Sequence, residues 1–71
     1  MGVLRVRLKD GVLTVEFFDE SGRKLKEEKY DKIVYLWADR ILISTADFIV
    51  RDVVDYKVVV KGNMATVKVV R

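Results

Sequence analysis

The sequence predicts a mainly β protein that folds as one small domain, residues 1–71, with antiparallel strands. Two observations carry this prediction: short runs in which apolar and polar residues alternate, and the turn signals Asp10-Gly11 and Gly62-Asn63 between such runs. They predict six or seven short strands, curled into a small barrel or a strongly twisted sheet. One short helix around residues 46–54 is the expected exception.

The first hairpin is the best-defined local element. The runs "VLRVRLK" and "VLTVEFF" flank Asp10-Gly11, and a type I′ turn there sets a single register. In that register Arg5 faces Glu16 on one side, and apolar residues face each other on the other side. The remaining predicted pairs are Lys9 with Val12, Leu8 with Leu13, Arg7 with Thr14, Val6 with Val15 and Leu4 with Phe17. Phe17 therefore points toward the core, and its neighbour Phe18 points away from it.

The charged segment "KLKEEKY", residues 24–30, predicts an edge strand protected by its charges, with a short solvated helix as the alternative. A three-residue loop with Gly22 in the left-handed region joins this segment to the preceding strand. That loop places Leu25 beside Phe17 and Lys26 beside Glu16.

Two further segments have less regular patterns. "KIVYLW" and "RILIST", separated by Ala38-Asp39, are apolar on both faces and predict a hairpin that is central in the fold or covered on both sides. In "ADFIVRDVVD" the apolar residues do not alternate, whereas on a helix they form one stripe. The stripe consists of Ile49, Val50, Val53 and Val54. We therefore expect a short helix or helical turn at 46–54.

The last hairpin is formed by "YKVVVK" and "MATVKVV" around Gly62-Asn63. Its predicted inner pairs are Val60 with Ala65, Val58 with Val67 and Tyr56 with Val69. On the outer side Lys57 faces Lys68, which is unfavourable unless an anion lies beside them.

The composition argues against catalysis. The chain has no Cys and no His, which removes disulfides, thiolate metal sites and the usual general base at neutral pH. Ser21 and Ser44 have no histidine to activate them. The many carboxylates belong to a chain that is small for enclosing a cleft. We therefore expect a non-catalytic protein without catalytic residues, a metal, a cofactor or a small-molecule substrate.

Few thermolabile residues and many Lys, Glu and Arg are typical of a hyperthermophile protein, although a designed scaffold without a ligand can share this bias. No apolar run reaches the length of roughly 18 residues that a membrane span needs. The start "MGVLRVRLKD" alternates and does not resemble a signal peptide. We expect a cytoplasmic protein with no membrane partner.

Two kinds of macromolecular partner fit the surface residues. The first hairpin directs an aromatic side chain with flanking arginines outward, a composition typical of protein interfaces. This partner-binding set is Phe18, Val3, Val12, Arg5 and Arg7. Alternatively, the net charge of +3 and the basic rows indicate a small basic β barrel that binds DNA or RNA. The nucleic-acid-binding set is Lys57, Lys61, Lys68 and Trp37, with Arg5 and Arg7.

The stretch "VEFFDESGRKLKEEKY", together with the size and composition of the chain, resembles the small archaeal inhibitors of PCNA, the sliding clamp of DNA replication. The resemblance implies a hyperthermophilic, archaeal regulator whose folded surface binds the clamp and blocks its use. Clamp subunits join through edge strands, so an exposed sheet edge of the inhibitor could compete there by strand addition.

Overall fold

The structure is a computed structural model that describes residues 1–38 and 41–71, and its described residues form eight strands and no helix. Sheet A has the order β3-β2-β1-β6, and sheet B has the order β5-β4-β8-β7. Sheet A consists of β1 (Gly2–Lys9), β2 (Val12–Phe18), β3 (Lys24–Tyr30) and β6 (Ala46–Val53). Sheet B consists of β4 (Tyr35–Ala38), β5 (Ile41–Ile43), β7 (Asp55–Lys61) and β8 (Met64–Val70).

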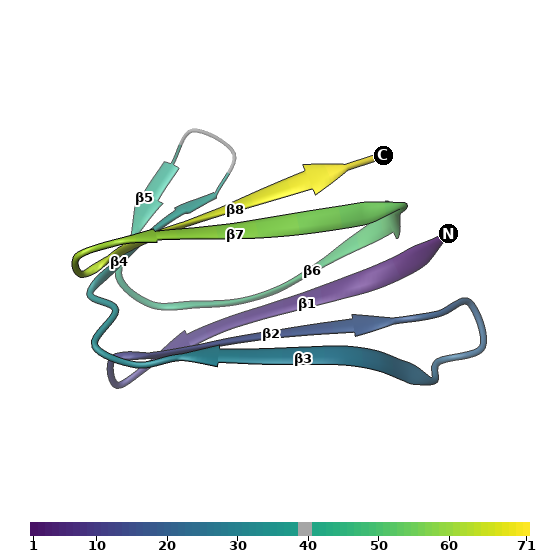
Figure 1. Cartoon of the computed structure of the whole chain (residues 1–71), viewed down its shortest axis with the longest axis horizontal. Helices are drawn as coiled ribbons and strands as arrows, with labels where there is room; N and C mark the ends of the chain where they lie inside the picture. The colour runs from purple at the N-terminus through teal and green to yellow at the C-terminus, as the bar shows by residue number, and fades with distance from the viewer. Residues whose placement is uncertain (39–40) are drawn as a thin grey trace.

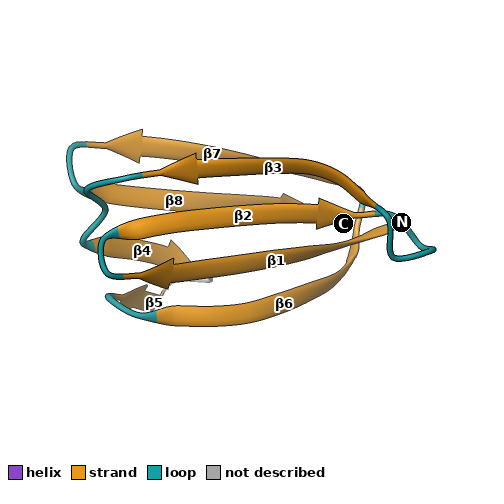
Figure 2. Ribbon diagram, turned by 90° about the horizontal axis from the view of Figure 1, so that it is seen from below, coloured by secondary structure: helices purple, strands orange, loops and turns teal. Residues whose placement is uncertain are grey.

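The two sheets stack face to face with their strands running in similar directions (Figures 1 and 2). The prediction of a small, mainly β domain is confirmed, whereas a closed barrel is wrong. The described residues form eight strands, one or two more than the sequence predicts. A closed barrel has no edge strand, but among the described residues each sheet ends in two edge strands, β3 and β6 in sheet A and β5 and β7 in sheet B.

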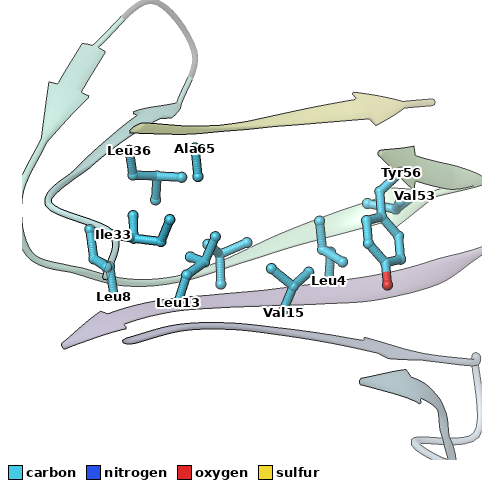
Figure 3. Packing of buried hydrophobic residues seen from close by; sticks show 10 residues of the cluster. Leu4, Leu8, Leu13, Val15, Ile33, Leu36, Val53, Tyr56 and Ala65 are labelled. Atoms are coloured by element: carbon cyan, nitrogen blue, oxygen red, sulfur yellow. The ribbon is translucent and has the colours of Figure 1, made fainter. Parts of the chain in front are cut away.

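The core lies between the sheets. Leu4, Val6 and Leu8 of β1 are buried against side chains from the facing sheet, where Leu36 and Ala65 point inward (Figure 3). The other buried members of this core are Leu13, Val15, Ile33, Val53 and Tyr56. Each buried aliphatic side chain contributes about 1.5–3 kcal/mol to folding, so this layer is the main source of stability.

Both predicted two-residue hairpins are present in the expected register. All predicted pairs of the first hairpin occur between β1 and β2, including Leu4 opposite Phe17. The second hairpin pairs β7 with β8 as predicted, with Lys57 opposite Lys68. At the first turn Asp10 and Gly11 both have positive φ, 51° and 77°, as a type I′ turn requires.

The pairing of β2 with β3 differs from the prediction by one residue. Segment 24–30 is the expected edge strand, not a helix, but Phe17 lies opposite Lys26 and Glu16 lies opposite Glu27. A bulge between Phe17 and Phe18 shifts the pairing. Leu25 is the extra residue of this bulge, so it has no cross-strand partner in the register, and it is 56% exposed. The loop itself is as predicted, because the Asp19 backbone N–H donates to the Arg23 carbonyl across three residues and Gly22 has a φ of 88°.

The helix predicted at 46–54 is wrong, because this segment forms strand β6 along β1. A register shift explains the misleading pattern: Leu4 pairs with Val50, but Gly2 pairs with Val53. The extra residue lies beside Asp52, whose φ is 59°. Such a bulge changes the phase of inward positions, so the apolar residues stop alternating although the chain stays extended.

The β4–β5 hairpin is covered on its inner face only. Leu36 is buried, whereas Tyr35 and Trp37 are 41% and 39% exposed, so the expected cover on both sides is wrong. The strand β4 pairs in parallel with β8 on one side and antiparallel with β5 on the other. Of the predicted turn at Ala38-Asp39, Asp39 lies outside the described residues.

A polar cluster joins the two sheets at the edge formed by β3 and β7. The Tyr56 hydroxyl donates to Oε1 of Glu28 over 2.7 Å, and the Tyr30 hydroxyl donates to the same carboxylate. Lys26 Nζ lies 3.3 Å from Glu28 Oε1 and 5.0 Å from the centre of the Tyr56 ring. The Phe17 ring packs edge-on against Tyr56 at 5.5 Å. These contacts hold β3 of sheet A to β7 of sheet B.

Candidate functional site

The two outer faces of the sandwich separate the residues predicted to bind partners. Arg5 and Arg7 lie on β1 and face outward from sheet A, because their neighbours Leu4, Val6 and Leu8 are buried. The other four members of the predicted nucleic-acid set, Lys57, Lys61, Lys68 and Trp37, lie on sheet B. The structure therefore does not bring that set together on one surface (Figure 2).

On the outer face of sheet A, Phe18 and Val3 are cross-strand neighbours and both are half-buried. Arg5 is next to this pair along β1, and Arg7 follows it. Val12 lies opposite Lys9 at the far end of the hairpin, about 20 Å from Phe18 at about 3.3 Å per residue. The predicted partner-binding set thus contains a compact part, Phe18, Val3 and Arg5, and a distant member.

Carboxylates neutralise much of the charge on this outer face of sheet A. Lys24 Nζ lies 2.9 Å from Glu16 and 3.1 Å from Glu27, and Arg5 lies 3.4 Å from Asp47. The hydrogen bond from Lys24 lowers the pKa of Glu16, and the charges of Arg5 and Arg7 lower it further. Arg5 is opposite Glu16 as predicted, but its ion pair is with Asp47 of the neighbouring strand β6.

The outer face of sheet B has a different composition. Trp37 lies opposite Leu42 on β5 and opposite Thr66 on β8, and Thr66 in turn lies opposite Val59. The next row is formed by Tyr35, Met64 and Lys61. Tyr35 and Trp37 are two residues apart on one strand, so their rings are on the same side of the sheet. Two exposed aromatic side chains therefore lie next to each other in an apolar surface.

Three lysines border this aromatic surface. Lys57 and Lys68 are direct cross-strand neighbours, and Lys61 is in the same row as Tyr35. Within residues 1–38 and 41–71 none of the three forms an ion pair with a carboxylate. Two like charges placed opposite each other destabilise a sheet. Such a pair is explained if it binds an anion.

Sequence reasoning identified the lysines and Trp37, did not single out Tyr35 among the tyrosines, and missed Leu42 and Met64. The spacing of Tyr35 and Trp37 was a usable signal, because residues i and i+2 of a strand share a face. The pairing of Met64 with Tyr35 could not be found this way. It depends on the parallel contact between β4 and β8, which are distant in the sequence.

The described part of the chain contains no group of three or more acidic residues placed to hold a metal ion. It also contains no helix that is long and apolar enough to cross a membrane. Comparisons with known protein families, curated proteins and solved structures found no match to this chain.

Proposed function

We propose that this protein binds single-stranded nucleic acid on the outer face of sheet B. The supporting observation is that Trp37 and Tyr35 are exposed beside Lys57, Lys61 and Lys68, and that no described carboxylate pairs with these lysines. By comparison, ion pairs with carboxylates already neutralise much of the outer face of sheet A.

The spacing suits a single strand. Aromatic side chains on a sheet stack with unpaired bases, and each stacked base contributes about 1–3 kcal/mol. Lys68 is one strand away from Trp37 and one row further on, a diagonal separation of about 7–8 Å. Phosphates can therefore contact the lysines while bases stack on the rings. Paired bases in a duplex offer no such face, which favours single-stranded DNA or RNA.

The proposal predicts a moderate salt dependence. Neutralising Z phosphates of a single strand gives a slope of about −0.7Z in log K against log salt. Three lysine contacts therefore give a slope of about −2. The measurement is fluorescence anisotropy of labelled oligo(dT) and oligo(U) at several concentrations of NaCl.

The variants Trp37→Ala and Lys68→Gln should each weaken binding by about tenfold, and Lys68→Gln should also make the salt slope less steep by about 0.7. The control is Lys29→Gln, the same change on an exposed lysine of sheet A. No binding at low salt, or an equal loss in the control, refutes the proposal.

A second candidate is protein binding on the outer face of sheet A. The observation that favours it is the half-buried Phe18–Val3 pair beside Arg5, since aromatic and arginine side chains dominate interface hot spots. Inhibition of an archaeal sliding clamp stays a prediction that rests on the resemblance. It is tested by calorimetry with a purified archaeal PCNA: wild type should bind, and Phe18→Ala should bind at least tenfold more weakly. Absence of heat with the wild type removes the clamp as partner.

A further inference from the structure

In sheet B, one side of strand β8 is only partly paired. The strand β8 has seven residues, but β4 pairs only with its first part, Met64–Thr66. Strand β5 beyond it is three residues long. From Val67 to Val70 no strand among the described residues pairs with β8 on the β4 side. Figures 1 and 2 show β8 continuing past the short strands β4 and β5.

Val67 and Val69 direct their backbone groups toward this open side. In a two-residue hairpin the residues that flank the turn form a hydrogen-bonded pair, and such pairs then alternate along the ladder. Lys61–Met64 flanks Gly62-Asn63, so Lys57–Lys68 is also such a pair. The intervening residues Val67 and Val69 therefore point their N–H and C=O groups away from β7.

An apolar cleft of about 560 Å³ lies at the same place, between the two sheets. Val67 and Val69 line it from β8, Phe48 and Val50 line it from β6, and Arg71 lies at its border. All four apolar side chains are half-buried. Val67 and Val69 therefore have backbone groups that are unpaired among the described residues, at the open edge of β8, and apolar side chains in the adjacent cleft.

We propose that an extended segment of a partner protein binds here as an added strand along Val67–Val70 of β8. The added strand would hydrogen-bond to Val67 and Val69 and place every second side chain in the cleft, so those side chains are aliphatic. Its alternate side chains lie on the outer face beside Lys68, with Arg71 next to the cleft. Acidic residues at these positions complement the charge. The site shares Lys68 with the proposed nucleic-acid surface, but it depends on the open backbone edge of β8 and on the cleft, which nucleic-acid binding does not use.

The geometry favours a single extended segment over other occupants. A small apolar molecule would fill the cleft but leave the edge groups of Val67 and Val69 without partners. A second copy that used its own β8 edge would bring its sheet A into the layer already occupied by β1 and β6 (Figure 2). A single extended segment carries no second sheet, so it avoids that collision.

Amide hydrogen exchange tests the open edge without any variant. In the free protein the amides of Val67 and Val69 should exchange quickly, whereas those of Lys68 and Val70 should be protected by β7. Slow exchange at Val67 and Val69 in the free protein would show that the edge is already occupied and would overturn the proposal.

The binding test uses a fluorescein-labelled peptide of eight residues that alternates Glu and Val, with a peptide of the same composition in two blocks as the control. The alternating peptide should bind at least tenfold more tightly and should slow exchange at Val67 and Val69. Equal binding of the block peptide, or no binding of either, refutes strand addition.

The variant Val69→Pro removes one edge N–H without touching a hydrogen bond to β7. The circular dichroism spectrum should not change. Binding of the alternating peptide should weaken by about tenfold, because the variant loses the hydrogen bond from the Val69 N–H to the peptide and perturbs the adjacent one, together about 1.4 kcal/mol. Oligo(dT) binding should not change, which separates this site from the nucleic-acid surface. Sedimentation of wild type as a dimer, with Val69→Pro a monomer, would assign the edge to self-association and overturn the proposal.

Discussion

The hydrogen bond from Tyr56 to Glu28 connects the two sheets, and Tyr56→Phe tests its contribution to stability. The hydroxyl donates to Glu28 Oε1 over 2.7 Å from a side chain that is 6% exposed. The substitution removes only this donor. The ring contacts with Phe17, at 5.5 Å, and with Lys26, at 5.0 Å, should remain. The variant therefore isolates one hydrogen bond between β7 and β3.

A hydrogen bond to a charged group contributes about 1.5–3 kcal/mol. Glu28 keeps its contacts with Tyr30 and Lys26, so the lower part of that range applies, and we expect a loss of about 1.5–2 kcal/mol at pH 7. In a domain of this size 1 kcal/mol corresponds to about 4–8 °C, so the melting temperature should fall by roughly 10 °C.

The loss should depend on pH. The hydroxyl donors Tyr30 and Tyr56 lower the pKa of Glu28 from its ordinary value of 4.5. A carboxyl group with a lowered pKa in the folded state stabilises the fold above its ordinary pKa, and this contribution is lost as the pH falls through the lowered value. The difference between wild type and Tyr56→Phe should therefore be larger at pH 7 than at pH 2.5.

Urea titrations followed by circular dichroism measure the free energy of unfolding at both pH values. The matched control is Tyr35→Phe, the same chemical change on an exposed ring of sheet B. It should change the free energy by less than about 0.5 kcal/mol, as surface substitutions usually do. A loss in Tyr56→Phe no larger than in Tyr35→Phe, or one that grows at low pH, would refute the reasoning.

Three further substitutions test the fold by thermal and urea unfolding. Phe17→Ala should cost about 3 kcal/mol because Phe17 packs against the core, whereas Phe18→Ala should cost about 1 kcal/mol; equal losses would mean that Phe18 is not on the outer surface. Asp52→Gly should raise the free energy of unfolding by about 0.5 kcal/mol, because glycine adopts the positive φ of this position without strain. The control Asp47→Gly, in the same strand, should lower the free energy of unfolding. A loss of stability in both variants would contradict the bulge. Gly2→Ala should cost about 1–3 kcal/mol, since its Cβ would collide with the Phe18 backbone carbonyl oxygen and lie 2.8 Å from the Phe17 ring; an unchanged melting temperature would show that β1 is not held there.

Local turn chemistry made part of the fold predictable. Asp10-Gly11 and Gly62-Asn63 each fix a register within a few residues, and both hairpins have the predicted pairs. The errors occur where one extra residue enters a strand, beside Asp52 in β6 and at Leu25 in β3. A bulge changes which positions face inward, and at these two places no residue type in the sequence indicated one.

The layered arrangement could not be predicted either, because it depends on contacts between distant segments. The pairing of β1 with β6 and the parallel pairing of β4 with β8 decide which faces are covered. The residues of the candidate site were also only partly predictable. The lysines and Trp37 were identifiable as outward residues, but their separation from Arg5 and Arg7 required knowledge of both sheets.

The central position of β1 in sheet A has a consequence for the folding kinetics. Its two partners are β2, across a two-residue turn, and β6, whose Asp47 lies 42 positions after Arg5 in the chain. The first pairing closes a short loop, whereas the second closes a long one and loses more chain entropy. We therefore expect the β1–β2 hairpin to be formed early and the β1–β6 pairing to be formed late. During synthesis, the unfinished side of β1 stays open until β6 has left the ribosome.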